Sequence, residues 1–296
     1  MKKWYSDLGL QARMLLTMFL LAVLYLFFLA VILTFRNAWT DILIIFMLVM
    51  LFLQFFFSDK MVLWSTGARL VTEQEEPRLH ETVSRLCAIA DLPKPKVAIV
   101  DSNVPNAFAT GRSKGSAVVA VTTSLKQKLS QPEIEAVLAH ELSHVKNRDM
   151  LVITIASFLS TVAALLVRNM LFFGMGGGDR DRKGAGAAII IFVVSIVVWI
   201  ISFLLIRALS RYREFAADRG SAIITGRPSN LASALMKISG VMENVPTRDL
   251  REVEAMNAFF IIPAVSGESL MNLFSTHPSV EARIRALEEM EQRMEF

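Results

Sequence analysis

The chain of 296 residues is 54% hydrophobic and 20% charged, whereas soluble domains are about 45–50% apolar with about a quarter of their residues charged. This composition excludes a wholly soluble protein. The formal net charge of +4 comes from basic residues that are spread along the chain and are not gathered with aromatic residues in one stretch. A nucleic acid is therefore not expected as a partner.

Four blocks that are nearly free of charge contain the hydrophobic excess. They cover residues 14–35, 38–57, 151–173 and 187–206. Each is close to the ~20 residues that a helix needs to cross the hydrocarbon core of a bilayer. The first block is too long for the ~7–15-residue apolar region of a cleaved signal peptide. We therefore expect a retained anchor and four transmembrane helices.

The basic residues predict how these helices are oriented. Lys2, Lys3 and Arg13 precede the first block, whereas the turn between the first two blocks holds a single arginine. Because cytoplasmic flanks carry the excess of Lys and Arg, residues 58–149 and 207–296 are expected in the cytoplasm. The glycine-rich turn between the last two blocks would then lie outside, although its three basic residues are unusual there.

The expected organisation has four parts. Two transmembrane hairpins alternate with two cytosolic segments, in the order 1–57, 58–149, 150–206 and 207–296. The fold class that we predict is a mainly α membrane protein with four transmembrane helices and a cytosolic α+β domain.

The first cytosolic segment shows helix and strand patterns in turn. An amphipathic helix is predicted over residues 77–90, and residues 97–100 and 117–123 have the composition of strands. Ser130 and Glu133 then form a capping box that opens another helix. Residues 207–226 are predicted to form a further helix that ends at a glycine, and the tail from residue 228 is predicted to hold two or three short helices.

Two isolated polar residues of the predicted helix 77–90 are given structural roles. Cys87, the single cysteine of the chain, shares a helix face with Val83 and Ala90, so we expect a buried, unreactive thiol. His80 has no partner at the spacing of a metal ligand and is not expected to bind one.

The stretch HELSH contains the strongest chemical signal. His140 and His144 are four residues apart, so a helix places both imidazoles on one face, where they can bind a single zinc ion. Glu141 is then placed to act as the base toward a water molecule at the metal. The alternative is a pair of surface histidines on a polar helix face.

A catalytic zinc normally takes three protein ligands, so a third must be found elsewhere. Glu214 and Asp218 are again four residues apart on a predicted helix. Glu214 can be the ligand, and Asp218 can hydrogen-bond the outer nitrogen of a histidine ligand. The alternative is an ordinary solvated helix face on which Arg211 or Arg213 pairs with these acids.

Four stretches in this order resemble the HtpX heat-shock membrane metalloproteases, which are related to the CaaX prenyl proteases of the endoplasmic reticulum. They are PNAFATG, HELSHVKNRD, RYREFAADRGSA and STHPSVEARIRAL. The resemblance covers nearly the whole chain. It implies a zincin-like (gluzincin) domain with one Zn²⁺ bound by His140, His144 and Glu214, Glu141 as the catalytic base, and Asp218 as support for a ligand.

The resemblance also implies roles for two further sites. It places an edge strand beside the cleft, where an extended substrate would pair; this strand consists of Asn106, Ala107, Phe108, Ala109, Thr110 and Gly111. Without the resemblance, this stretch would be interpreted as a turn between strands. His277 resembles a family position close to the active site. Stabilising the tetrahedral intermediate is one possible role for it, and capping a nearby helix is the alternative.

The sequence thus predicts a multi-pass zinc endopeptidase of the cell membrane with its catalytic domain in the cytoplasm. Its expected substrates are polypeptides, above all misfolded or damaged membrane proteins, and its oligomeric state stays open. An intramembrane protease is disfavoured because charged residues flank the HELSH motif on both sides. A catalytically silent membrane scaffold and a prenyl-peptide protease remain as alternatives, and a transporter is a more distant one.

Overall fold

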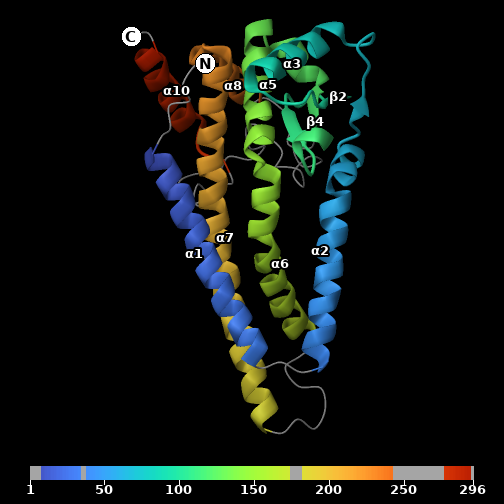
Figure 1. Cartoon of the computed structure of the whole chain (residues 1–296), viewed down its shortest axis with the longest axis vertical. Coiled ribbons are helices and arrows are strands. Elements are labelled where there is room, and N and C mark those ends of the chain that lie inside the picture. Colours follow the sequence, from blue (N-terminus) through green and yellow to red (C-terminus); the bar gives the residue numbers. More distant parts are fainter. Residues whose placement is uncertain (1–7, 35–37, 174–181, 243–276, 295–296) are drawn as a thin grey trace. The chain divides into compact units, whose positions relative to one another are not determined.

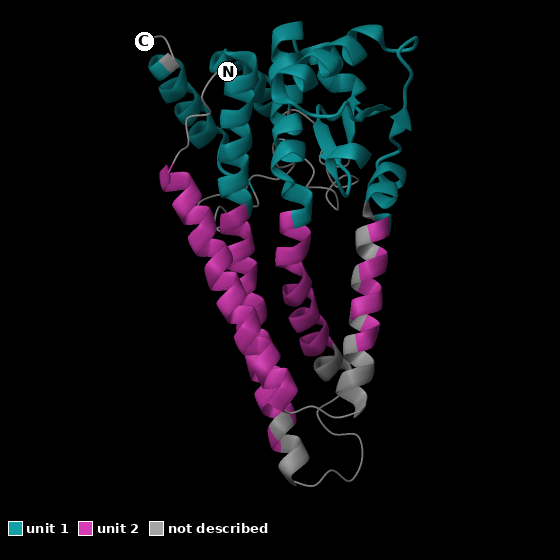
Figure 2. Cartoon of the chain, in the orientation of Figure 1, with its two compact units in different colours: residues 1–6, 57–151, 210–296 teal, residues 7–56, 152–209 magenta. Residues whose placement is uncertain are grey.

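The computed structural model describes residues 8–34, 38–173, 182–242 and 277–294, which are mainly helical (Figure 1). The connection ENVPTRDLREVE, at 243–254, lies outside the described residues. The chain divides into two compact units, each drawn from separate segments (Figure 2). Unit 1 is built mainly from Phe57–Leu151 and Ser210–Phe296, and unit 2 from Asp7–Phe56 and Val152–Leu209.

Unit 2 is helical. It contains α1 (Leu8–Thr34), most of α2 (Ala38–Ser65), and large parts of α6 (Asp149–Phe173) and α7 (Arg182–Thr225). Within the described residues, three helical stretches are long and apolar enough to cross a membrane: Leu8–Thr34, Asp149–Arg168 and Ala188–Thr225. The second expected span lies in α2, where many side chains are outside the described residues. Three of the four expected spans are therefore found by length and composition.

Side chains of α1, α6 and α7 form the interior of unit 2. Phe28 and Val198 are 1% and 0% exposed and pack in one cluster with Ala163. Large apolar side chains also cover the outside of α1, where Leu15 and Leu26 are each 68% exposed. An apolar surface of this extent is typical of helices that face lipid.

The fourth hydrophobic block and the helix predicted after it form one continuous helix, α7, of 44 residues. The prediction of two separate helices is wrong. No proline or other helix-breaking residue lies between Ile206 and Arg211, so the helix continues. The predicted end is confirmed. The helix stops at Thr225, and Gly226 takes a positive φ of 70°, a conformation that glycine adopts without steric cost.

Unit 1 contains a four-stranded sheet with the strand order β1-β2-β4-β3. The strands are β1 (Arg69–Leu70), β2 (Lys96–Val100), β3 (Ala107–Thr110) and β4 (Val118–Thr122). The strands predicted over residues 97–100 and 117–123 are confirmed as β2 and β4, which pair in parallel. The strand implied at residues 106–111 is present as β3, antiparallel to β4 and at the edge of the sheet. β1 is too short to leave an alternating pattern in the sequence.

The hydrogen bonds of β3 show which of its backbone groups face the open edge. The Asn106 carbonyl accepts from the Thr122 N–H at 2.9 Å, and the Asn106 N–H donates to Thr122 Oγ1 at 2.8 Å. Because backbone groups alternate between the two sides of a strand, those of Ala107 and Ala109 point away from β4. Among the described residues no further strand pairs with this edge of β3, where Ala107 and Ala109 are 1% and 8% exposed.

The helix that carries the HELSH motif, α5 (Gln131–Asn147), lies in the middle of unit 1. Its capping box is confirmed, with Ser130 and Glu133 exchanging hydrogen bonds. Its side chains pack against α3 (Pro77–Ala90), the sheet and α8 (Pro228–Met242), and Val137 and Leu142 are fully buried. A rigid, buried helix fixes the position of any site that it carries.

α5 does not run on into α6. Arg148 takes the left-handed conformation with φ 56°, and its N–H bonds to the carbonyls of His144 and Val145. Such a residue ends a helix, and α6 begins at Asp149. The HELSH helix and the following membrane helix are therefore separate elements.

The structural roles predicted for His80 and Cys87 agree with the structure. Nε2 of His80 lies 3.0 Å from the Val71 carbonyl oxygen. Cys87 is 2% exposed, and burial raises the pKa of its thiol to about 11. A thiol with this pKa stays protonated and unreactive near neutral pH.

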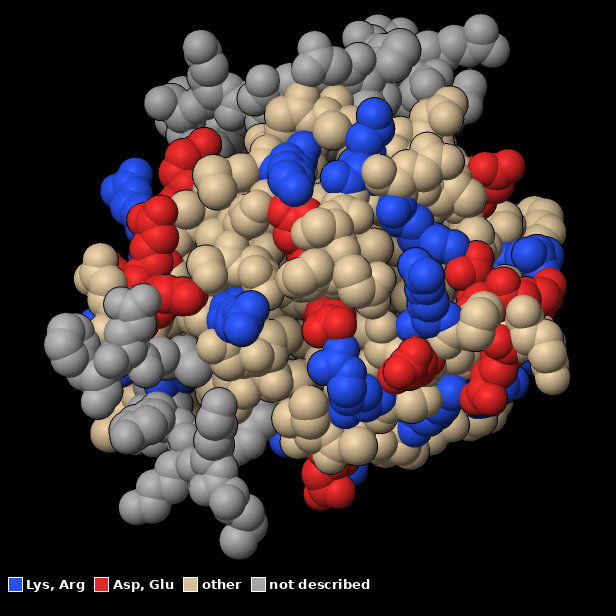
Figure 3. Space-filling model, turned by 90° about the horizontal axis from the view of Figure 1, so that it is seen from above, with Lys and Arg blue, Asp and Glu red and all other residues tan. Residues whose placement is uncertain are grey.

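Charged side chains of both signs are mixed over the face of the molecule shown in Figure 3. No single sign dominates the described part of this face. Such mixing is the ordinary pattern of a solvated protein surface.

Glu133 links the start of α5 to α8, and its charge should stabilise unit 1. It is 4% exposed and accepts from Ser130, from Ser233 Oγ at 2.6 Å and from Lys237 Nζ. Burial alone would raise its pKa, but Lys237 and the hydroxyl groups lower the pKa to about 2. Glu133 therefore stabilises the fold above the pKa of an unfolded glutamate, about 4.3, and this contribution is lost as the pH falls towards 2.

We predict that Glu133→Gln lowers the free energy of unfolding at pH 7 by about 1–3 kcal/mol, because Lys237 loses its charged partner. Thermal unfolding in detergent micelles should show a difference from wild type that shrinks between pH 5 and pH 2. Glu81→Gln, at an exposed position of α3, is the control and should change little. A difference that is constant down to pH 2 would contradict the role of the charge.

Candidate metal centre

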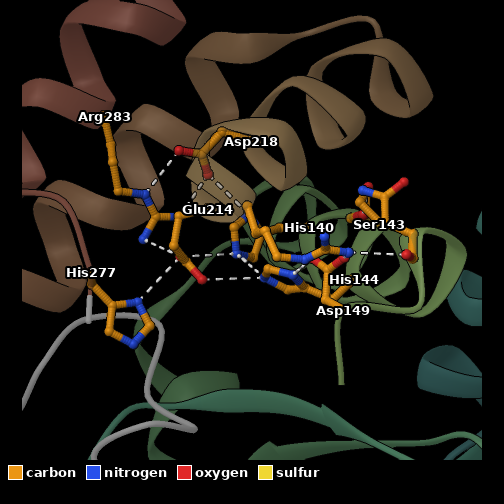
Figure 4. A network of polar contacts seen from close by, with 11 residues as sticks. His140, Ser143, His144, Asp149, Glu214, Asp218, His277 and Arg283 are labelled. Atoms are coloured by element: carbon orange, nitrogen blue, oxygen red, sulfur yellow. Dashed lines mark hydrogen bonds and ion pairs between the residues drawn. The ribbon is translucent and has the colours of Figure 1, made fainter. Parts of the chain in front are cut away.

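α5 and α7 bring the two histidines and Glu214 together, although about 70 residues of chain separate them. Nε2 of His140 lies 3.1 Å from Nε2 of His144. The carboxylate of Glu214 places Oε2 3.6 Å from His140 Nε2 and Oε1 3.4 Å from His144 Nε2. These three side chains form a compact triangle of donor atoms in unit 1 (Figure 4).

The triangle has the size that a small tetrahedral cation requires. Ligand atoms about 2.0–2.1 Å from a tetrahedral ion are about 3.4 Å from one another. The two Nε2 atoms are 3.1 Å apart, and each lies 3.4 or 3.6 Å from a different oxygen of the Glu214 carboxylate. Two imidazole nitrogens with one carboxylate oxygen are a donor set that suits zinc. The residues present therefore fit a zinc ion of this coordination.

Each histidine of the triangle has a carboxylate at its other ring nitrogen. Nδ1 of His140 lies 2.9 Å from Asp218 Oδ1, and Nδ1 of His144 lies 2.6 Å from Asp149 Oδ2. A carboxylate at Nδ1 holds the proton on that nitrogen. The lone pair of Nε2 is then directed into the triangle in both rings.

Asp149 is a site residue that the sequence analysis did not single out. Arg213 binds its other carboxylate oxygen and also donates to the Asn147 carbonyl at 3.0 Å. The alternative interpretation of the sequence was that an arginine of α7 pairs with Glu214 or Asp218. Arg213 does not form that pair. Its partner is Asp149, at the point where the chain turns from α5 into α6, and only the turn at Arg148 brings that carboxylate back to His144.

Arg283 of α10 (Val280–Met294) is the second residue that the sequence analysis missed. It is 1% exposed, and its guanidinium donates to both carboxylate oxygens of Asp218, at 2.9 and 2.6 Å. Its Nη1 also lies 3.3 Å from Glu214 Oε2. The available signal was its spacing of four residues from the buried Leu287, which puts an arginine on the apolar face of an amphipathic helix.

His277 lies beside the triangle, just before α10. It is 7% exposed, and its Nδ1 lies 3.3 Å from Glu214 Oε2. The cap of α10 is provided by Ser279, whose hydroxyl accepts from the Ala282 N–H at 3.2 Å. The position of His277 is therefore explained by the site rather than by helix capping.

Comparisons with known proteins agree with this geometry. The family model of Peptidase family M48 matches residues 73–291. The chain belongs to this peptidase family.

Its relatives include proteins described as HtpX proteases. The chain is 66% identical over 293 residues to "Protease HtpX homolog 2" of Methanosarcina mazei, with 99% of each chain covered. It is 60% identical to "Protease HtpX homolog" of Moorella thermoacetica, over 98% of this chain and 97% of the relative. The resemblance to the HtpX family is thereby confirmed, and the chain is a metalloprotease of the HtpX type.

A solved structure shows the same fold at lower sequence identity. The crystal structure of Ste24p from S. mikatae matches with a TM-score of 0.53 and 18% identity. The match covers 95% of this chain and 66% of that one. At this level of identity the likeness concerns the fold alone.

In this M48 protease, Glu141 lies between the metal triangle and the edge strand. It is 5% exposed, and burial raises the pKa of its carboxyl. The Ala109 N–H, on the open edge of β3, hydrogen-bonds to this carboxylate. A carboxylate with a raised pKa is better suited to accept and return a proton than an exposed one.

A glycine of α7 permits the close contact with α5 that forms the triangle. A Cβ on Gly220 would lie 2.2 Å from Ser143 Oγ, which is far inside van der Waals contact. The next residue, Ser221, donates from its hydroxyl to the Ala136 carbonyl at 2.6 Å. These two contacts fix the register of the two helices that carry Glu214 and the histidines.

Protons and a metal ion compete for the ring nitrogens of the two histidines. Burial alone would lower the pKa of His144, but Asp149 and Glu214 raise it well above its ordinary value. Burial alone would also lower the pKa of His140, but Asp218 and Glu214 raise it. A cation that binds the triangle must displace these protons, so metal affinity should fall as the pH is lowered.

We predict that Asp149→Asn weakens zinc binding about 10–100-fold, because His144 loses the partner that orients its ring. His144→Ala should abolish stoichiometric zinc, so the two variants give a graded pair. The measurement is zinc content of the purified protein against a series of chelator concentrations.

Asp91→Asn is the control. Asp91 ends α3 with a positive φ of 54°, a conformation that asparagine tolerates, and it belongs neither to the donor triangle nor to the carboxylates behind it. It should bind zinc like the wild type. If Asp149→Asn also binds zinc with unchanged affinity, Asp149 does not support the ligand.

Proposed function

We propose that this HtpX-type protease is a zinc-dependent endopeptidase that cleaves misfolded or damaged membrane proteins at the cytoplasmic face of the cell membrane. The observation that carries the proposal is the triangle of His140, His144 and Glu214, with the buried Glu141 beside it. A carboxylate base next to three metal ligands is the arrangement that metal-assisted peptide hydrolysis requires.

His140, His144 and Glu214 would hold one Zn²⁺ per chain. When bound, zinc supplies a Lewis acid that polarises the scissile carbonyl and lowers the pKa of a coordinated water. Asp218 and Asp149 hold the two imidazoles in the tautomer that exposes Nε2. The protein thus presents ligands that need no rearrangement to bind the ion.

Glu141 would accept a proton from the attacking water and deliver it to the leaving amine. Its burial, which raises its pKa, makes both transfers accessible to one carboxyl group. The reaction requires no covalent intermediate with the protein. His277 would stabilise the negative charge that develops on the substrate oxygen, since it lies at the Glu214 end of the same site.

The substrate would bind as an added strand along residues 106–111. The open edge of β3 offers the backbone groups of Ala107 and Ala109, and Ala109 already contacts Glu141. A peptide that pairs there is held next to the base by backbone hydrogen bonds, which depend little on side-chain identity. This mode suits unfolded segments of many sequences.

The same proposal includes the topology of the chain. Two membrane hairpins, at residues 1–57 and 150–206, would alternate with the catalytic segments 58–149 and 207–296. Unit 1 contains residues from both sides of the second hairpin, which supports an even number of crossings between His144 and Glu214. The basic residues near the N-terminus support the cytoplasmic location of these segments.

A catalytically silent scaffold is the alternative of a different class. The ligand set, the base and the carboxylates behind both histidines are all present, which favours an active enzyme. A protein that only bound partners would not need a buried base at an open strand edge.

We predict that Glu141→Gln keeps stoichiometric zinc and loses at least about 100-fold in activity, because the proton acceptor is removed. The assay is cleavage of casein by the full chain in detergent micelles, with and without a zinc chelator. Glu135→Gln, on the same helix but paired with Arg85, is the control and should retain activity. Full cleavage by Glu141→Gln would falsify the assignment of the base.

The physiological substrates can be sought with the same variant. Membrane proteins that are degraded in cells expressing the wild type should accumulate in cells expressing Glu141→Gln. Proteomic comparison of the two membrane fractions measures this. Accumulation of soluble proteins alone would contradict the proposed substrate class.

The topology predicts the reactivity of introduced cysteines in a Cys87→Ala background. Lys128→Cys and Arg227→Cys, at two exposed positions of unit 1, should both be protected from a membrane-impermeant maleimide in intact cells. Both should react after permeabilisation, and Gly177→Cys in the glycine-rich turn should react in intact cells. Labelling of one catalytic segment without the other would make the shared metal site impossible.

A further inference from the structure

A cavity adjoins the metal triangle at the C-terminal end of β3. It has a volume of about 340 Å³, part of it open solvent, and lies between residues 109–114 and residues 144–151 of unit 1. The described residues of both segments belong to the same compact unit as the site.

The cavity shares two residues with the catalytic centre. His144 of the triangle lines it, and so does Ala109, whose N–H bonds to Glu141. Because a strand advances about 3.3 Å per residue, a peptide paired along β3 would place a side chain into the cavity within two residues of the scissile bond. An occupant of this cavity would therefore lie next to a peptide that is paired along β3.

The walls of the cavity carry positive charge. Arg112, Lys114 and Arg148 line it, and no Asp or Glu does among the described residues. Outside the cavity wall, the Asp59 carboxylate lies 3.7 Å from Arg112 Nε. Concave sites lined by one sign of charge concentrate the field of that charge.

One buried hydroxyl group in the cavity wall has no partner. Thr110 is 2% exposed, and its Oγ1 has no hydrogen-bond partner among the described residues. Buried polar groups in native proteins are nearly always paired, so an orphan requires an explanation. Because Oγ1 is itself buried, a rotation about the Cα–Cβ bond is needed before this hydroxyl can donate to a carboxylate in the cavity.

The backbone builds the basic wall at a fixed place. Gly111 has φ +138°, and a Cβ there would lie 2.7 Å from the Ala117 Cα. Only glycine fits this turn, which ends β3 and brings Arg112 and Lys114 to the cavity. The cations are therefore positioned by the fold and not by a free loop.

We propose that this cavity is a specificity subsite that takes the acidic side chain, Asp or Glu, of a substrate residue within two positions of the scissile bond. The inference rests on the proposed peptidase function and names a preference for that site. An anionic lipid headgroup has the same charge. The sharing of Ala109 and His144 with the catalytic centre favours a substrate side chain, and the experiment separates the two.

The test uses the full zinc-loaded chain in detergent micelles. Cleavage sites in casein are mapped by mass spectrometry, and matched peptides with Glu, Gln or Lys are made at the two positions on each side of one site. At one of these positions, kcat/KM for Glu should exceed that for Gln about tenfold, as expected for a charge-assisted hydrogen bond. Lys114→Glu should reverse the order so that Lys is preferred to Glu.

Two further variants separate specificity from stability. Lys128→Glu reverses an exposed lysine that does not line the cavity and should keep the preference for Glu. Thr110→Val should reduce the Glu/Gln ratio severalfold without lowering the unfolding temperature, because it removes only an unpaired hydroxyl.

Equal cleavage of the Glu and Gln peptides at all four positions by an active wild type would overturn the subsite and leave the peptidase intact. Loss of chelator-sensitive casein cleavage would instead overturn the proposed function. If Lys114→Glu lowers cleavage of all peptides equally, and only in vesicles that contain anionic lipid, the cavity binds lipid and the subsite is wrong.

Discussion

The site depends on how this fold neutralises the charged and polar groups that it buries around one point. His140 contacts Asp218, which is bound by Arg283, and His144 contacts Asp149, which is bound by Arg213. Each imidazole is thus followed by a carboxylate and then a guanidinium. Burying a charge without a partner is costly. In these two series of contacts each carboxylate is paired with a guanidinium even without a metal ion. These contacts also direct both Nε2 atoms towards Glu214.

These two series of contacts connect segments that are distant in sequence. α5 supplies the histidines, α7 supplies Glu214, Asp218 and Arg213, and α10 supplies Arg283. Gly220 permits α7 to approach α5, and the turn at Arg148 returns Asp149 to His144. The donor triangle therefore forms only when α5 and α7 pack together, and α6 and α10 supply Asp149 and Arg283 around it. A partly folded chain would lack it, which limits metal binding to the native state.

The same assembly places the base next to a strand with an open edge. Glu141 lies on α5, which also carries both histidines, and it accepts a hydrogen bond from the Ala109 N–H, so the proposed chemistry and peptide binding would share one boundary. In the proposed mode of binding, backbone pairing along β3 would give affinity with little selectivity. The basic cavity beyond Ala109 would add a charge preference to that general mode. A protease of this design would accept many unfolded chains and still distinguish among them.

The sequence by itself predicted most of the helices, the strands β2 and β4, and the candidate ligands. Fixed local spacings are enough to predict α5 from its capping box, the histidine pair from its separation of four residues, and Glu214 with Asp218 from the same periodicity. The tertiary structure decided which carboxylate lies behind which histidine, and it added Asp149 and Arg283. Asp149 reaches His144 through a left-handed turn, and Arg283 reaches Asp218 from the last helix. Such contacts depend on how helices pack across long stretches of chain, and no local pattern of residues encodes that packing.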